Sequence, residues 1–276
     1  MRKLYILASL VAVLLVSLCG CGGLAQGVIE KNKTVIRVGA TPSPHAEILN
    51  SKAVQDYVAS KGYELEVVVY NDYVLPNKAL NDGSIDANYF QHIPYLESEN
   101  STKGYDLVAA CEVHNEPLNL YGKTNKDNWS NTKIYIVNDY SNVERAFLLL
   151  LANGLITSYD VTDFNPNKPV YTSEIGVTIE CIDPTLLRFK VEEGGYAVIP
   201  GNYALNAWNT TQAQQYKLFG ESVEVAYPNI IAVKSENLNS EKTKILVEAL
   251  AQAEVKTFIE ETYGPTVNYV FKSYLQ

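Results

Sequence analysis

The sequence predicts an α/β protein, because runs typical of buried strands alternate with segments of helical periodicity along most of the chain. The run Val67-Val68-Val69 is continuously β-branched, as in a sheet that is covered on both faces. Such alternation favours mainly parallel sheets. The chain has 276 residues, of which 47% are apolar. About 240 structured residues suit two Rossmann-like lobes better than a single core.

The first half of the chain is expected to begin with a strand over 35–40, which Thr41-Pro42-Ser43-Pro44 closes. A helix is expected over 47–60, where apolar residues recur with helical spacing as far as a stop at Lys61-Gly62. The alternation then predicts strands over 65–70, 85–88 and 107–111, and helices through 78–81 and over 94–102.

The second half has its clearest helix over 141–153, with Ser141 and Glu144 as a capping box and Asn153-Gly154 as the exit. Strands are expected over 134–137, 175–182, 195–199 and 230–233. The last strand is followed by one long amphipathic helix over 240–263, which Gly264-Pro265 stops.

The N-terminus has the pattern of an export signal. Met1-Arg2-Lys3 is a basic start, and Leu4 to Leu18 is an almost unbroken apolar run. Fifteen residues form about 22 Å of helix, which is short of the roughly 30 Å hydrocarbon core of a membrane. We therefore predict a signal over residues 1–20 rather than a permanent span. Residues 22–33 lack core periodicity and are expected to be a tether.

The chain is acidic, with 22 basic and 31 acidic residues and a formal net charge of −9. Loss of residues 1–20 would remove two basic and no acidic residues, which gives a net charge of about −11. This balance disfavours a nucleic-acid partner, because a phosphate backbone is bound by clustered Lys and Arg.

Two neighbouring segments gather aromatic rings, amides and a histidine where a predicted strand breaks into a loop. They are residues 70–80, YNDYVLPNKAL, and residues 85–95, IDANYFQHIPY. Ligands of α/β proteins collect at strand ends, where the chain reverses and side chains converge on a crevice. We therefore expect both segments to line a ligand site.

Both segments resemble the MetQ/NlpA-type methionine-binding lipoproteins of bacterial ABC importers, which carry N-D-Y-x-x-P-N and D-A-N-x-F-Q-H motifs. Residues 138–146, NDYSNVERA, resemble the family's P-N-D-x-x-N-x-x-R-A pattern, and Tyr227-Pro228-Asn229 is similar to its Y-x-N. Leu18-Cys19-Gly20-Cys21 resembles a lipobox, so Cys21 is the expected lipidated first residue of the mature protein. The resemblance extends over nearly the whole mature chain.

The resemblance implies a hinged clamp of two lobes, with crossing segments near residues 115–119 and 225–229. Lobe 1 would hold 34–116 and 229–276, and lobe 2 would hold 117–228. The implied protein is anchored to the cell membrane by two acyl chains on Cys21 and faces the extracytoplasmic side. It would deliver L-methionine or a close analogue to the permease and ATPase of an importer. No enzymatic activity, cofactor or resident metal is expected.

Arg145 is the expected partner of the ligand's carboxylate. It lies one turn into a predicted helix, where a carboxylate gains from the positive helix end and from a bidentate guanidinium. In the family this arginine binds the ligand carboxylate. The alternative is a surface ion pair with Glu144 or Asp139. Asn142, one turn earlier, would orient the charged head of the ligand.

Tyr73, Phe90 and His92 are the candidates for the other end of the ligand. A thioether gains modestly from aromatic edges about 5 Å away. Each residue would otherwise be a packing residue, and the shared family block favours the ligand role. Asn229, on the second crossing, would contact the ligand head, and its alternative is an Asx turn beside Pro228.

The chain departs from the family pattern at two positions. Pro200 replaces an asparagine that contacts the ligand in relatives, and Asn202 is expected to substitute for it from two residues on. Asn119 replaces a glycine in the block that resembles E-P-M-G. Both changes leave room for a different cargo, such as a Met-containing dipeptide or another apolar amino acid.

Other functional classes have weaker support in the sequence. A metal cargo would need the histidines and nearby acids, but their spacing is not that of a metal site. These residues are His45, His92, His114, Glu112 and Glu116. An enzyme is disfavoured because the chain lacks a serine elbow and a phosphate loop. Cys111 and Cys181 are either a disulfide or two thiols.

Overall fold

The computed structural model describes residues 34–222 and 227–276. The predicted signal over 1–20, the lipidation site Cys21 and the tether to residue 33 lie outside the described residues, so they stay predictions. Within the described part of the chain, no helix has both the length and the apolar character needed to cross a membrane.

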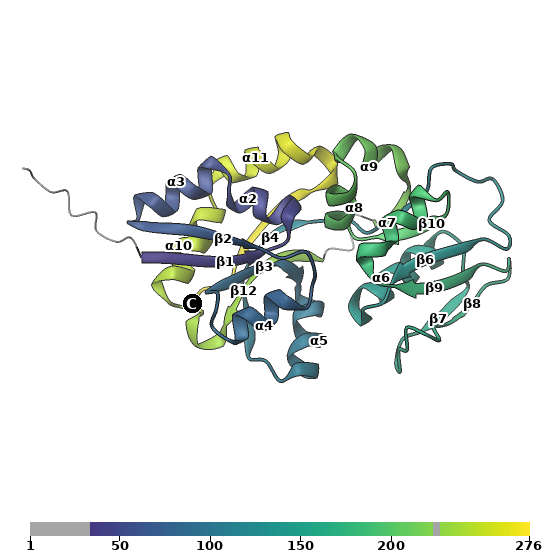
Figure 1. The fold of residues 1–276 in the computed structure, drawn as a ribbon, viewed down its shortest axis with the longest axis horizontal. Helices are drawn as coiled ribbons and strands as arrows, with labels where there is room; N and C mark the ends of the chain where they lie inside the picture. The colour runs from purple at the N-terminus through teal and green to yellow at the C-terminus, as the bar shows by residue number, and fades with distance from the viewer. Residues whose placement is uncertain (1–33, 223–226) are drawn as a thin grey trace, which may run out of the picture. The chain divides into compact units, whose positions relative to one another are not determined.

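Strands from the two ends of the described chain form a six-stranded sheet (Figure 1). Its strands are β1 (Thr34–Ala40), β2 (Tyr63–Val69), β3 (Ala87–His92), β4 (Leu107–Asn115), β12 (Pro228–Lys234) and β13 (Asn268–Ser273). Their order in the sheet is β13-β4-β12-β3-β1-β2. β1 is parallel to β2 and β3, whereas β12 is antiparallel to both β3 and β4, and β13 is antiparallel to β4.

The middle of the chain forms a five-stranded sheet of order β11-β5-β10-β6-β9 and a separate hairpin. The sheet contains β5 (Asn119–Tyr121), β6 (Lys133–Val137), β9 (Thr178–Ile182), β10 (Tyr196–Ile199) and β11 (Lys217–Gly220), and the hairpin contains β7 (Ser158–Asp160) and β8 (Val170–Thr172). β6 is parallel to β9 and β10, whereas β5 is antiparallel to β10 and β11.

The two crossings explain why both sheets are mixed rather than mainly parallel. The chain leaves the first sheet at Asn115 and returns at Pro228, which is the residue paired with Asn115. It enters the second sheet at Asn119 and leaves at Gly220, which are also paired. A strand that starts where its neighbour stops must run antiparallel to that neighbour. The predicted α/β class is confirmed, and the lobe bounds stay a prediction with which this grouping of strands agrees.

Helices cover both faces of each sheet, so the central strands are apolar on both faces. The helices are α2 (Glu47–Leu49), α3 (Lys52–Ser60), α4 (Leu75–Asn81), α5 (Ile93–Lys103), α6 (Tyr140–Ala152), α7 (Pro184–Glu192), α8 (Gly201–Ala207), α9 (Thr210–Tyr216), α10 (Glu241–Leu250) and α11 (Ala253–Tyr263). In β12, Ile231 and Val233 join the core under α3, α10 and α11. Ile230 and Ala232 join the core under α4 and α5.

Two predicted helices are each broken in the structure. The expected helix over 47–60 is divided into α2 and α3, and the expected helix over 240–263 is divided into α10 and α11. In both, the apolar spacing contains a step of five residues, from Leu49 to Val54 and from Leu250 to Val255. In a continuous helix, the apolar residues after this step would point away from the core. The break changes the direction of the chain, so these residues face the core again.

The predicted capping box of the helix after β6 is also wrong. Asp139, rather than Ser141, is the N-cap of α6, and its carboxylate accepts from the backbone N–H of Asn142 at 2.9 Å. Ser141 lies within the helix and donates to the same carboxylate. The helix therefore starts earlier than predicted, and this start fixes the direction of Asn142 and Arg145.

Candidate ligand-binding site

All seven predicted ligand-binding residues line one cavity. They are Tyr73, Phe90, His92, Asn142, Arg145, Asn202 and Asn229. The cavity has a volume of about 20 Å³ and is completed by Gln91, Tyr95, Glu116, Pro200 and Gly201. The lining comes from ends of strands and helices of both sheets, as expected for a ligand site of an α/β fold.

Strand pairing brings two of the predicted residues together across a long sequence separation. His92 is the last residue of β3, and it pairs with Asn229 near the start of the antiparallel β12. Phe90 lies in the fully buried strand β3, two residues before His92. The end of β3 and the start of β12 therefore lie at the edge of the six-stranded sheet from which the chain crosses to the second sheet.

A cluster of aromatic rings lines the cavity. The ring centroids of Tyr73, Phe90 and Tyr95 stand 5.7–5.8 Å apart in all three pairs. Tyr203 adds a ring 4.9 Å from that of Tyr73. Edges of aromatic rings are a favourable environment for a polarisable apolar chain, including a thioether.

Arg145 brings a positive charge to the lining and is buried rather than solvated. Its Nε donates to Glu221 Oε1 at 2.8 Å and its Nη2 to Glu221 Oε2 at 2.6 Å, which is a bidentate ion pair. Nη1 donates to Asn142 Oδ1 at 3.0 Å, and Nη2 also donates to the backbone carbonyl of Glu116. These four bonds leave one of the five N–H donors for a ligand. The surface pairing with Glu144 or Asp139 is therefore not observed.

Asn142 connects His92 to Arg145. His92 Nδ1 accepts from the backbone N–H of Tyr95, so its Nε2 carries the proton and donates to Asn142 Oδ1 at 3.1 Å. The Asn142 amide donates in turn to Asp139. Burial, with the nearby Arg145 cation, lowers the pKa of His92 to about 3, so this imidazole is neutral near pH 7.

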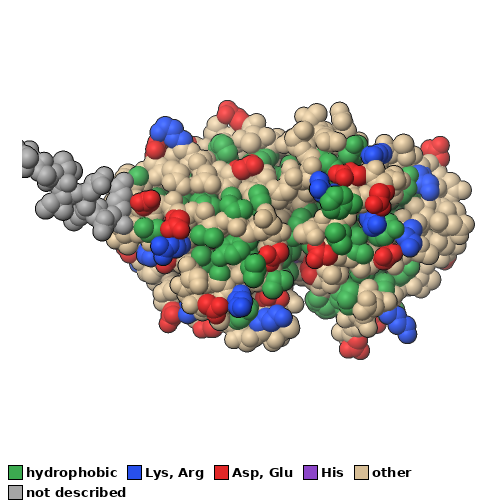
Figure 2. All heavy atoms as spheres, viewed as in Figure 1, with side chains coloured by type: hydrophobic (Ala, Val, Ile, Leu, Met, Phe, Trp, Pro, Cys, Tyr) green, Lys and Arg blue, Asp and Glu red, His purple; other side chains and the backbone are tan. Residues whose placement is uncertain are grey.

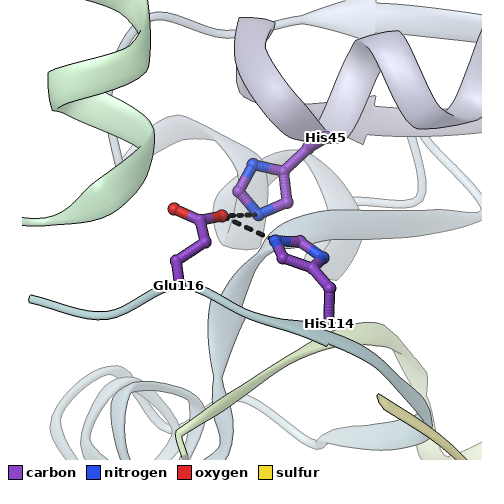
Figure 3. A group of neighbouring side chains, drawn as sticks. All are labelled: His45, His114 and Glu116. Atoms are coloured by element: carbon purple, nitrogen blue, oxygen red, sulfur yellow. Dashed lines mark hydrogen bonds and ion pairs between the residues drawn. The ribbon is translucent and has the colours of Figure 1, made fainter. Parts of the chain in front are cut away.

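A second polar group lies against the cavity and consists of His45, His114 and Glu116 (Figure 3). His45 Nε2 lies 3.2 Å and His114 Nε2 2.7 Å from Glu116 Oε1. All three side chains are buried. Of the five residues considered for a metal, these three are together, whereas Glu112 contacts Lys272 and Tyr274 instead.

Comparison with known proteins identifies the family. The family model described as NlpA lipoprotein matches residues 36–271. The chain belongs to the NlpA lipoprotein family. It is similar to the methionine-binding lipoprotein MetQ of Bacillus subtilis strain 168, with 36% identity over 276 residues that cover 97% of this chain and 98% of the relative.

Solved structures agree with this assignment. A nutrient-binding protein from Burkholderia cenocepacia bound to methionine has a TM-score of 0.76 and 32% identity, and the match covers 86% of this chain and all of that one. A periplasmic substrate-binding protein of an ABC transporter from Coxiella burnetii has a TM-score of 0.76 and 28% identity, with 85% of this chain covered and all of that one. The family consists of substrate-binding lipoproteins, which confirms that the chain is not an enzyme.

The two departures from the NlpA pattern have different consequences. Pro200 lines the cavity as the N-cap of α8, and Asn202 lies beside it in the first turn. Asn202 Oδ1 accepts from the hydroxyl of Tyr73 at 2.7 Å, while its buried Nδ2 has no hydrogen-bond partner among the described residues. An unpaired buried donor is costly, so this amide suits a ligand acceptor.

Asn119, by contrast, does not line the cavity. Its Nδ2 donates to the carbonyl of Pro117 and to the hydroxyl of Tyr121. Its Oδ1 lies 2.3 Å from where a Cβ of Gly220 would stand. The side chain at 119 is therefore accommodated by a glycine on the paired strand, and this departure leaves the ligand site unchanged.

The sequence analysis missed four contributors to this NlpA-type site. Tyr95 and Gln91 lie within the recognised block, so their spacing could have indicated them. Glu116 stands in the E-P pair that was noted without a role. Glu221, the partner of Arg145, is 76 residues away in sequence and no local pattern indicates it.

The cysteines are separate thiols. Cys111 is buried in β4 of the six-stranded sheet, and Cys181 is partly buried in β9 of the five-stranded sheet. Burial raises the pKa of Cys181 to about 12, which keeps this thiol protonated and unreactive near pH 7. No disulfide therefore connects the two sheets.

Proposed function

We propose that this protein binds L-methionine, or a close analogue, between its two lobes and delivers it to the permease and ATPase of an ABC importer. The main support is that all seven residues expected from the resemblance line one cavity. Aromatic rings and a buried guanidinium both line that cavity. This combination matches a ligand with an apolar thioether and a charged head.

The relatives support the same ligand. The Bacillus subtilis relative is named as a methionine-binding lipoprotein, and the Burkholderia structure is described as bound to methionine. The Coxiella neighbour is described as a substrate-binding protein of an ABC transporter. The permease partner is proposed on that description, and the specific complex is part of the proposal.

Thermal unfolding of protein that lacks residues 1–21 tests the ligand. Methionine at 100 times its Kd adds about 2.7 kcal/mol to the free energy of unfolding. The ligand-free state is prepared by unfolding, dialysis and refolding. Met-containing dipeptides and other apolar amino acids are measured in parallel. Absence of stabilisation by methionine, with stabilisation by one of these, would replace methionine by that ligand.

We also propose that Cys21 carries the lipid anchor at the extracytoplasmic side of the membrane. The matched variants are Cys21→Ser and Cys19→Ser, of which only the first removes the proposed attachment site. Cell fractionation should find the Cys21→Ser protein uncleaved or released, and the Cys19→Ser protein in the membrane fraction. Equal behaviour of the two variants would contradict the assignment.

The distribution of surface charge is consistent with a binding protein that does not self-associate. On the face shown in Figure 2, acidic and basic side chains are interspersed. The excess of acidic residues makes the surface self-repelling. This charge pattern supports the prediction that a nucleic acid is not the partner.

A further inference from the structure

Glu116 is a buried carboxylate on the wall of the cavity, and the proposed function gives it no role. Its side chain is 5% exposed. One carboxylate oxygen faces two imidazoles, those of His45 and His114, which reach it from the turn before α2 and from the end of β4 (Figure 3). The backbone N–H of Asn202 donates to the same carboxylate.

Both imidazoles beside this carboxylate are neutral. His114 Nε2 donates to it at 2.7 Å, whereas His45 Nε2 donates to Asn229 Oδ1 at 3.0 Å. His45 Nδ1 lies 2.8 Å from the hydroxyl of Thr41, and His114 Nδ1 contacts the hydroxyl of Tyr89. Each Nδ1 therefore has a hydroxyl donor, which leaves the proton on Nε2. Burial lowers the pKa of His45 to about 4 and that of His114 to about 3. Burial raises the pKa of Glu116, while His114 Nε2 and the backbone N–H of Asn202 donate to the carboxylate without bringing a formal positive charge.

The cation of the cavity is already neutralised. Both oxygens of Glu221 hold the Arg145 guanidinium, at 2.8 and 2.6 Å. Glu116 therefore has no cation of its own among the residues that line the cavity, and a cation bound beside it would favour its ionised form. A buried charge of this kind is costly unless a cation pairs with it.

Acceptors and donors are placed for a zwitterion. Asn229 Oδ1 accepts from His45 Nε2 at 3.0 Å, so it lies on the Glu116 side of the cavity. The unpartnered Nδ2 of Asn202 and the remaining N–H of Arg145 are donors. The acceptor oxygens of Asn229 and Glu116 suit an ammonium, and the donors of Asn202 and Arg145 suit a carboxylate.

We propose that Glu116, together with Asn229, binds the α-ammonium group of the ligand, an inference that rests on the proposed function. The site then selects free amino acids, because an N-acyl group removes the charge that Glu116 requires. N-acetylmethionine and the des-amino analogue of methionine are therefore rejected. The aromatic rings of the cavity set the side chain, and Glu116 sets the head group.

A divalent cation on the same three residues is the competing explanation. The ligand atoms of His45, His114 and Glu116 lie within 4.8 Å of one another. Ligand atoms on a tetrahedral metal with bonds of about 2.1 Å stand roughly 3.4 Å apart. The 2.7 Å between His114 Nε2 and Glu116 Oε1 is a hydrogen-bond distance, and His45 Nε2 is hydrogen-bonded to Asn229 Oδ1, so the geometry favours a hydrogen-bonded carboxylate over a shared metal.

Calorimetric titration of protein lacking residues 1–21 tests the inference. The probes are methionine, its des-amino analogue and N-acetylmethionine, with wild type, Glu116→Gln and Glu112→Gln. Glu112 is the matched control, since it lies on β4 outside the cavity. Wild type should bind the two analogues at least about 30-fold more weakly than methionine. Glu116→Gln should lose about 30-fold for methionine, and its affinity for the des-amino analogue should change less than about threefold.

The outcomes separate the inference from the function on which it rests. If Glu116 had only a structural role, Glu116→Gln would bind methionine and the des-amino analogue more weakly by the same factor. This result overturns the inference. Equal binding of methionine and the des-amino analogue by wild type also overturns the inference. This comparison needs no variant, so the test remains possible even if Glu116→Gln fails to fold. A stoichiometric divalent metal found by elemental analysis also overturns the inference. Absence of methionine binding by wild type overturns the proposed function and the inference together.

Discussion

The ion pair between Arg145 and Glu221 provides a quantitative test of the site's electrostatics. Both side chains are buried, with 5% and 6% exposure. The Glu221→Gln variant keeps the shape and one acceptor oxygen but removes the counter-charge of the guanidinium. Removal of one partner of a buried pair costs about 3–5 kcal/mol, because the other charge stays buried and unpaired. Since the amide keeps one acceptor, we expect a loss of about 3 kcal/mol.

Urea unfolding at pH 7, followed by circular dichroism, measures this loss. The control is Glu180→Gln, which removes the acid of an exposed pair with Lys133 at an N–O distance of 3.0 Å. Its unfolding midpoint should not move, because exposed pairs are screened by solvent. If Glu221→Gln lowered the midpoint no more than this control does, the argument from burial would be refuted.

The same variant examines how the ligand carboxylate is bound. In Glu221→Gln the amide oxygen still accepts one N–H of Arg145, and the second N–H that Glu221 holds becomes available to a ligand carboxylate, beside the N–H that has no partner among the described residues. Methionine should therefore stabilise Glu221→Gln by more than it stabilises wild type, at equal ligand concentration. A smaller stabilisation would mean that Glu221 orients the guanidinium for the ligand rather than competing with it.

Three further predictions concern packing, the contact between the sheets, and pH. Gly220→Ala should cost about 1–3 kcal/mol, because its Cβ would stand 2.3 Å from Asn119 Oδ1, and Asn119→Gly should rescue it in urea unfolding; failure of the rescue would contradict the contact. Tyr73→Phe should weaken methionine binding by about 1 kcal/mol in calorimetry, since it removes the bond to Asn202, and unchanged affinity would show that this bond is not needed. Burial and Arg145 lower the pKa of His92 to about 3, so the unfolded chain binds a proton near pH 6.5 that the folded chain does not bind. This contribution to stability is present above pH 6.5 and is lost as pH falls, by at most about 1.4 kcal/mol per unit for His92. Burial also lowers the pKa of His45 and His114, so these groups add to the slope, and His92→Gln should reduce the slope in unfolding titrations without abolishing it; an unchanged slope in the variant would exclude His92 as a source.

Local patterns predicted the elements that carry the site. Asn142 and Arg145 fall in the first turns of a helix, as the sequence indicated. Phe90 and His92 were expected after a strand over 85–88, whereas the structure places both inside β3 (Ala87–His92). The breaks after α2 and α10 were missed, although the five-residue step between apolar positions was present in the sequence. A single irregular step within a helical pattern is a weak signal beside the many regular ones.

Long-range partners could not be predicted from local patterns. Arg145 was assigned a local acidic partner or a ligand, and the structure gives it Glu221 instead. His45 and His114 are 69 residues apart, and only the fold brings both to Glu116. The family resemblance found the residues of the cavity because it carries information about the fold that periodicity does not. The resemblance did not reveal which of these residues already have hydrogen-bond partners within the protein.

The contacts that close the cavity are made by the residues that line it. Tyr73 reaches Asn202, and His92 reaches Asn142, each by one hydrogen bond from the six-stranded sheet region to the five-stranded one. Two further bonds, from the backbone of Ser43 to Asn206 and from Gln214 to Thr266, lie outside the lining set. A ligand that engages Asn202 and Arg145 on one side and the aromatic rings on the other therefore adds to the same cross-sheet connection. Binding energy then favours the closed arrangement directly, because the closed arrangement is the one in which both halves of the lining reach the ligand.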